Sequence, residues 1–188
     1  LDGTAELRFA SVDPVPISQT LYGDDGTSAV NWGAFSNWET GAAAATSYND
    51  PSLNDPVHGE LMKITSGTNW GGNHGFVYWY GTMQSSLDAY NAFNIKVKGL
   101  PNDRLEVALE GGGAQSVASV SMSDTTVSTD LGDGWYEVSI PSSAFSNSSA
   151  AGFATHNSIK IGSPENNATP FEFYFTNAGF SGLDYPAG

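Results

Sequence analysis

The feature that most constrains this fold is a two-residue alternation of apolar and polar side chains, repeated in short segments. Residues 93–97 read Phe-Asn-Ile-Lys-Val, and residues 105–109 read Leu-Glu-Val-Ala-Leu. Because successive side chains of a strand point to opposite faces, each segment predicts a strand with one buried face. Similar segments recur at 135–140, 159–161 and 171–175, and convincing helical periodicity is absent. The sequence therefore predicts an all-β protein.

Clusters of Gly, Asn and Pro separate the alternating segments, as at residues 130–134 and 163–170. Such clusters are typical of turns. A chain of 188 residues is long enough to bury one sizeable core. We expect a β-sandwich, a jelly roll of two antiparallel sheets, as one domain over residues 21–188. Residues 1–20 are expected to form an N-terminal arm or an edge strand.

The charge of the chain limits its partners. Six basic residues stand against twenty acidic ones, which gives a formal net charge of −14. Such a surface repels phosphate backbones and anionic lipids, so we expect no nucleic acid partner and no membrane partner. No apolar run approaches the ~18 residues of a spanning segment. The chain has no cysteine, which excludes disulfides, zinc thiolate sites and cysteine nucleophiles.

Five motifs, in order, resemble those of the family 11 carbohydrate-binding modules and related jelly-roll modules of bacterial glycanases. They are Asp-Asp-x5-Asn-Trp-Gly-Ala-Phe at 24–35, a Trp-Gly loop before an aromatic strand at 67–80, Ala-Phe-Asn-Ile-Lys-Val at 92–97, Gly-Trp-Tyr-Glu-Val-Ser-Ile-Pro at 134–141 followed by Phe145, and Phe-Tyr-Phe-Thr-Asn at 173–177. The resemblance covers residues 21–182. It implies a jelly roll with a concave binding face and β-glucan ligands.

Aromatic residues are the main candidates for ligand binding, because the apolar faces of a pyranose stack on a ring while its hydroxyls meet polar groups. The densest aromatic stretch is 69–80, and Trp70 sits there among Gly and Asn residues. Trp70 is either a stacking platform or a cap on the sandwich edge. The predicted ligand-binding residues are Trp70, Trp38, Trp79, Tyr80, Phe35, Asn69, Asn73 and His74.

The strand expected at 76–80 leaves one choice open. Phe76, Tyr78 and Tyr80 share one face, and Val77 and Trp79 share the other. One of these sets joins the core, and the sequence does not say which. We expect Trp32 and Trp135 in the core.

A calcium ion is the one cofactor considered, held by Asp24 or Asp25 with backbone carbonyls. The resemblance places Thr27 and Thr176 where a related module carries acids, and a hydroxyl is a poor ligand for Ca²⁺. Any such site is expected to be weak. His58 is expected to be exposed to solvent or to bind hydroxyls, since no metal-ligand spacing surrounds it.

We predict that the protein is not an enzyme. A retaining glycosidase needs two neighbouring carboxylates, whereas Glu106 and Glu110 would lie ~13 Å apart along a strand. Two arginines are little material for a polysaccharide lyase, and no Gly-x-Ser-x-Gly elbow occurs. The expectation is a monomeric accessory module of a larger secreted bacterial glycanase, trimmed at Leu1 from a longer chain, that binds a neutral β-glucan. A jelly-roll lyase or hydrolase and a structural or adhesive sandwich remain alternatives.

Overall fold

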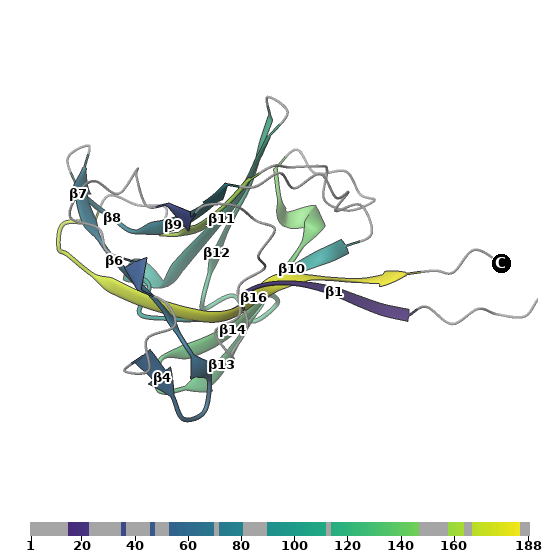
Figure 1. Cartoon of the computed structure of the whole chain (residues 1–188), viewed down its shortest axis with the longest axis horizontal. Helices are drawn as coiled ribbons and strands as arrows, with labels where there is room; N and C mark the ends of the chain where they lie inside the picture. Colours follow the sequence, from purple (N-terminus) through teal and green to yellow (C-terminus); the bar gives the residue numbers. More distant parts are fainter. Residues whose placement is uncertain are drawn as a thin grey trace, which may run out of the picture.

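The computed structural model describes residues 15–22, 35–36, 46–47, 53–69, 72–80, 90–111, 114–146, 158–163 and 167–184. These residues form two antiparallel sheets and two short hairpins (Figure 1), with 3-10 turns η4 (Pro101–Asp103) and η5 (Ser142–Ala144). The predicted all-β sandwich is confirmed. In the described part of the chain, no helix has both the length and the apolarity that a membrane span requires.

The first sheet has seven strands and is organised around the long C-terminal strand. Its order is β13-β14-β10-β16-β6-β3, and β1 also pairs with β16. The bounds are β13 Ser128–Gly132, β14 Trp135–Pro141, β10 Tyr90–Lys98, β16 Glu172–Asp184, β6 Met62–Thr65, β3 Thr46–Ser47 and β1 Val15–Tyr22.

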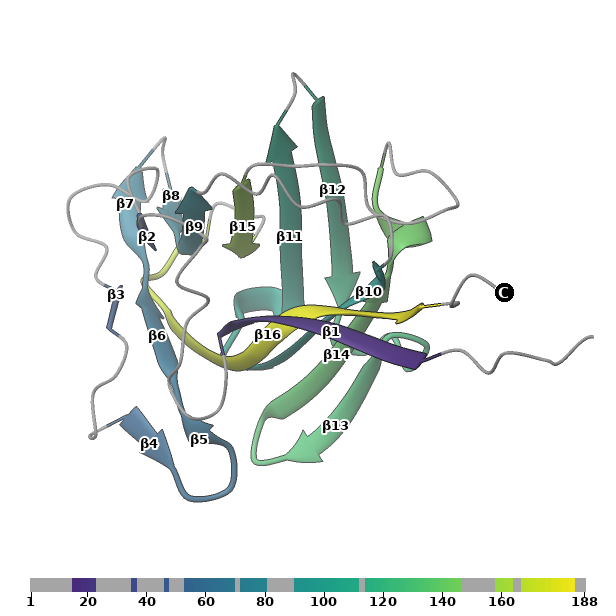
Figure 2. The ribbon, with the colours of Figure 1, turned by 45° about the vertical axis from the view of Figure 1, so that its right-hand side comes forward.

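The second sheet has five strands in the order β12-β11-β15-β9-β2, which Figure 2 shows side by side. The bounds are β12 Ala114–Ser121, β11 Arg104–Gly111, β15 Ser158–Gly162, β9 Phe76–Tyr80 and β2 Phe35–Ser36. Two further hairpins pair β4 Asn54–Asp55 with β5 Gly59–Glu60, and β7 Gly67–Asn69 with β8 Gly72–His74.

The core lies between the two sheets and is built from the predicted apolar positions. Phe93 and Val97 of β10 are completely buried, as are Leu105 and Leu109 of β11 in the other sheet. The rings of Phe93 and Phe180 meet edge to face with their centroids 5.4 Å apart. Burial of this many large side chains supplies the main free energy of folding. Period-two alternation therefore predicted the core correctly for these strands.

β1, the first strand that the structure describes, belongs to the sandwich. β1 pairs antiparallel with the second half of β16, from Val15 opposite Asp184 to Tyr22 opposite Ala178. Figure 2 shows the two strands running together. β1 contains residues 15–20 of the segment that was expected to form an N-terminal arm or an edge strand, and it continues to Tyr22.

Trp135 is buried, as expected, but outside the core between the sheets. Val97 lies opposite Tyr136 and faces the core. The next pair, Lys98 and Trp135, therefore points to the outer face of the seven-stranded sheet, because successive side chains of a strand alternate between faces. The His58 ring, from the β4–β5 hairpin, packs on Trp135 with the ring centroids 4.5 Å apart. The expectation of an exposed His58 is wrong, because only 9% of this residue is exposed.

Gly162 allows strands β15 and β9 to approach each other. An added Cβ at this position would overlap the Gly75 carbonyl oxygen and Phe76 Cβ. Overpacking of this kind costs about 1–3 kcal/mol. We therefore expect Gly162→Ala to lower the free energy of unfolding by that amount, measured by urea and thermal denaturation.

The matched control is Gly132→Asn, since Gly132 has φ +86° and a Cβ added there would meet nothing within 4 Å. Asn is among the non-glycine residues that best tolerate this left-handed region, so Gly132→Asn should lower the free energy of unfolding by less than Gly162→Ala does. Equal stability of Gly162→Ala and the parent protein would contradict the close β15–β9 contact.

Candidate functional site

The outer face of the five-stranded sheet is the candidate site. Ile159 and Ile161 of β15 face the core and are completely buried. The alternate residue Lys160 therefore belongs to the outer face. The register continues this outer row through Ala108 on β11 and Tyr78 on β9. The neighbouring row of the outer face lies two residues further along each strand. It is formed by Glu106, Gly162 and Phe76.

Lys160 is the centre of this face. Its Nζ lies 3.1 Å from Glu106 Oε1, and the two side chains are 18% and 19% exposed. The same Nζ lies 4.8 Å from the centroid of the Phe76 ring. Partial burial strengthens both the ion pair and the cation–π contact relative to a fully exposed pair. The arrangement holds an ammonium donor and a carboxylate acceptor together with no net charge.

The β11–β12 side of the face is polar and open. Arg104 Nη2 donates a hydrogen bond of 2.9 Å to Ser119 Oγ, and both residues are exposed. Towards the middle of the sheet the outer residues Ala108 and Ser158 are small and buried. The face thus carries hydrogen-bonding groups at one side and the aromatic strand β9 at the other.

The register of β9 resolves the choice that the sequence left open. Tyr78 lies opposite Lys160 and Tyr80 opposite Ser158, so these positions share the rows of the outer face. Trp79 lies opposite the buried Ile159 and also opposite Phe35 of β2. The pairing therefore separates Tyr80 from Trp79 and Phe35, although all three were predicted to bind ligand. Tyr78 was not in that prediction, and its parity with Tyr80 is the signal that identifies it.

The β7–β8 hairpin brings together three of the predicted polar residues. Asn69 pairs with Gly72, Asn73 with Thr68, and His74 with Gly67. The hairpin leads through Gly75 into β9, and Figures 1 and 2 both show it beside that strand. The predicted site residues Trp70, Trp38, Asp24 and Asp25 lie outside the described residues, as does Trp32, which was expected in the core.

Metal-ligating side chains do not gather in the described ranges, where no group of three or more His, Cys, Asp or Glu residues could hold an ion. Thr176, which the resemblance places at a calcium position, is completely buried in β16.

The outer face of the seven-stranded sheet has a different character. One row crosses it from Trp135 through Lys98 and Tyr174 to Lys63. Lys98 Nζ lies 6.0 Å from the Trp135 ring centroid, and Lys63 Nζ lies 5.9 Å from that of Tyr174. A polar groove of about 420 Å³ lies on this sheet. Its lining includes Asn94, Lys96, Thr129, Glu137, Ser139 and Asn177.

Comparison with known proteins identifies the fold. No protein-family model and no curated protein sequence matches the chain. Solved structures match over most of their length. A mutant family 29 carbohydrate-binding module complexed with cellulohexaose has a TM-score of 0.53 at 11% identity, with 88% of this chain and 91% of that chain covered. The fold is that of carbohydrate-binding modules.

Two further structures agree. The family 11 carbohydrate-binding module from Clostridium thermocellum, in complex with a β-1,3-1,4-mixed-linked tetrasaccharide, has a TM-score of 0.51 at 16% identity, with 88% and 96% coverage. A family 28 module specific for non-crystalline cellulose has a TM-score of 0.51 at 10% identity, with 85% and 92% coverage. The structural similarity to family 11 modules that the motifs suggested is confirmed at the level of the fold.

An ion-pair network on the seven-stranded sheet perturbs the pKa of Glu172. Its Oε1 lies 2.6 Å from Lys63 Nζ, and its Oε2 accepts a 3.2 Å hydrogen bond from the Tyr174 hydroxyl. The hydrogen bond from Lys63 is the largest cause that lowers the pKa of Glu172 from its ordinary value, and it outweighs partial burial. A lowered folded-state pKa contributes stability above the unfolded-state pKa, and this contribution is lost as pH falls through the folded-state pKa.

We expect an NMR titration of the Glu172 carboxyl carbon to give a midpoint below that of an unperturbed Glu. Lys63→Met should raise this midpoint towards the ordinary value, whereas the control Lys96→Met should leave it in place. Because this pair is exposed, its effect on stability should stay within about 1 kcal/mol. A midpoint that is insensitive to Lys63→Met would show that another group perturbs the carboxylate.

Proposed function

We propose that the protein is a non-catalytic carbohydrate-binding module that binds a neutral β-glucan of the laminarin, mixed-linkage or cellulose type. The ligand would lie on the outer face of the five-stranded sheet. The observation that supports this proposal is the register of β9, which places Tyr78 opposite Lys160 and Tyr80 opposite Ser158, in two rows of the outer face.

The chemistry of that face suits a pyranose chain. A sugar ring presents an apolar face to an aromatic ring and equatorial hydroxyls to polar groups. In this proposal Tyr80, Tyr78, Trp70 and Trp38 supply the rings. The Lys160–Glu106 pair, 3.1 Å apart, offers one donor and one acceptor to adjacent hydroxyls. Asn69, Asn73 and His74 extend the polar set from the β7–β8 hairpin.

Electrostatics favours a neutral polymer. The chain carries a net charge of −14, so an anionic glycan would approach against a repulsive field. The one lysine placed on the five-stranded sheet is neutralised by Glu106. The known modules of the same fold were solved with or described for cellulohexaose, a mixed-linked tetrasaccharide and non-crystalline cellulose, which supports the same ligand class.

We further propose that the module acts outside the cell as an accessory domain of a bacterial glycanase. Binding would hold a linked catalytic domain at high effective concentration on its polymer. A calcium ion at Asp24 or Asp25 is compatible with this role, which depends only on the sheet and its loops.

Affinity electrophoresis against a panel of polysaccharides tests the function. We expect retardation by laminarin, barley glucan or soluble cellulose at low salt, and little retardation by alginate or carrageenan in calcium-free buffer. The glucan should release no reducing ends after prolonged incubation. Cleavage would identify an enzyme, strong binding to alginate would overturn the charge argument, and no binding at all would favour a structural protein.

Substitution of single rings tests the face. Trp70→Ala and Tyr80→Ala should each weaken glucan binding by about 1.5–3 kcal/mol, roughly ten- to a hundredfold, through loss of apolar burial. Isothermal titration calorimetry measures this loss, and the melting temperature should change little.

Two controls make this experiment specific. Tyr174→Ala removes a half-buried ring from the other sheet and should leave glucan affinity unchanged. Trp79→Ala changes a position in the row of buried residues, so it should lower stability by about 3–5 kcal/mol. Normal affinity in both Trp70→Ala and Tyr80→Ala would exclude these rings as platforms.

A further inference from the structure

A separate hollow of about 260 Å³ opens where the two sheets meet at one end of the sandwich. It forms where β10 ends and the chain crosses through η4 into β11. Its lining residues are Val97, Lys98, Gly99, Leu100, Asp103, Met122, Gly134 and Tyr136. The proposed glucan face uses none of these residues.

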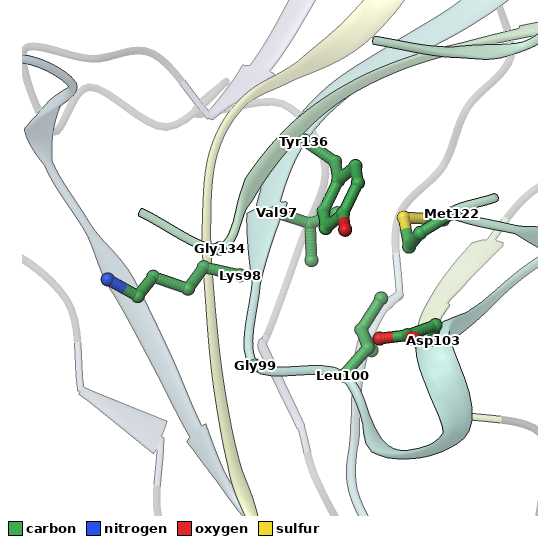
Figure 3. A pocket seen from close by; sticks show the side chains of 8 residues that line it. All are labelled: Val97, Lys98, Gly99, Leu100, Asp103, Met122, Gly134 and Tyr136. Carbon is green, nitrogen blue, oxygen red and sulfur yellow. The ribbon is translucent and has the colours of Figure 1, made fainter. Parts of the chain in front are cut away.

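The inner surface of the hollow is apolar. Leu100 and Met122 keep 8% and 5% of their surfaces exposed, whereas Val97 is completely buried and offers no surface to a ligand. Tyr136 is half-buried and packs against the core. Figure 3 shows the ring of Tyr136, the sulfur of Met122 and the side chain of Leu100 around the same space. An apolar floor with one flat ring is the environment that the C–H face of a sugar requires.

Two polar groups at the rim are available to a ligand. Figure 3 shows the Asp103 carboxylate and the Tyr136 hydroxyl beside the hollow, while the Lys98 ammonium points away from it. In the part of the chain that the structure describes, neither the Asp103 carboxylate nor the Tyr136 hydroxyl makes a hydrogen bond or an ion pair. The Asp103 backbone is held in place, because its carbonyl oxygen accepts a 2.8 Å hydrogen bond from the Met122 N–H.

The turns around the hollow adopt unusual backbone conformations. Asn102 and Asp103 have φ values of 57° and 53°, and Asp133 has a φ of 50°. Gly99 has a φ of 83°, and a Cβ there would lie 2.8 Å from the Glu172 carbonyl oxygen. Left-handed non-glycine residues cost free energy and concentrate at functional sites. Here they place the Asp103 carboxylate at the opening.

We propose that this hollow binds one neutral hexopyranose unit, either a free sugar or the terminal residue of a chain. The volume is smaller than the ~300–1,000 Å³ of pockets for larger ligands, so it accommodates a single ring. The Asp103 carboxylate would accept hydrogen bonds from adjacent hydroxyls, and the Tyr136 hydroxyl would donate to a third oxygen. With so few contacts, the dissociation constant should be on the order of 1 mM. This second site extends beyond the proposed glucan face and does not depend on it.

Chemical-shift titration of the ¹⁵N-labelled protein with methyl β-glucoside tests the proposal. The expected result is saturable shifts at the amides of Gly99, Asp103, Met122 and Gly134. Asp103→Asn should weaken this binding at least tenfold, since an amide tolerates the same left-handed backbone but supplies only one acceptor oxygen. Tyr136→Leu, which keeps the apolar volume and removes the flat ring, should weaken it similarly.

The matched control is Glu137→Gln. It removes one negative charge, as Asp103→Asn does, from the residue next to Tyr136 on the other face of β14, and should leave the titration unchanged. Far-UV circular dichroism and melting curves establish that each variant is folded.

Three results would overturn the proposal: no saturable shifts with methyl glucoside, shifts confined to the five-stranded sheet, or saturable binding of phenol in place of the glucoside. Retardation by polymeric glucan reports separately on the sheet face, and Asp103→Asn should leave it unchanged. Failure of one site is therefore distinguishable from failure of the other.

Discussion

The pairing of β16 is the constraint on which the rest of the structure depends. This strand of 13 residues pairs with β10 along one edge, and with β6 and then β1 along the other. Its buried residues Phe173, Phe175 and Phe180 form a large part of the core. A register shift between β10 and β16 coincides with Asn177, whose φ is 50°. β16 thus joins β1 to the centre of the fold.

The sandwich presents two outer surfaces with different chemistry. The outer face of the seven-stranded sheet carries lysines, carboxylates and hydroxyls. Its tryptophan, Trp135, is covered by His58 of the β4–β5 hairpin. The five-stranded sheet places a neutral ion pair next to an aromatic strand. Since both sheets share one core, these differences come from the outward residues alone. A scaffold of this kind can carry different sites on its outer surfaces, because the core between the sheets is common to them.

The end of the sandwich adds a third environment. The crossover from β10 to β11 cannot continue either sheet, so its turns use left-handed residues and leave a hollow above the core. A long polymer is suited to an extended sheet face, whereas a single sugar ring is suited to an enclosed hollow. In the two proposals, the extended face would bind a polymer and the hollow a single sugar unit, through surfaces that do not share residues.

The sequence by itself determined the strands with clear period-two alternation, namely β9, β10, β11, β14, β15 and the first part of β16, and the parity of the aromatic strand, because these depend on local geometry. It did not indicate β12 or β13, whose polar and small residues carry a weak alternation. The alternation showed that Tyr80 and Trp79 point to opposite faces of their strand, but it did not show which of the two faces lies on the outside of the sandwich. Only the tertiary structure decided this, since the pairing of Trp79 with Ile159 joins segments 80 residues apart in the chain. The burial of His58 on Trp135, the Lys160–Glu106 pair and the hollow beside Asp103 likewise arise from contacts between distant segments. Local periodicity carries no information about such contacts, which depend on strand order and register.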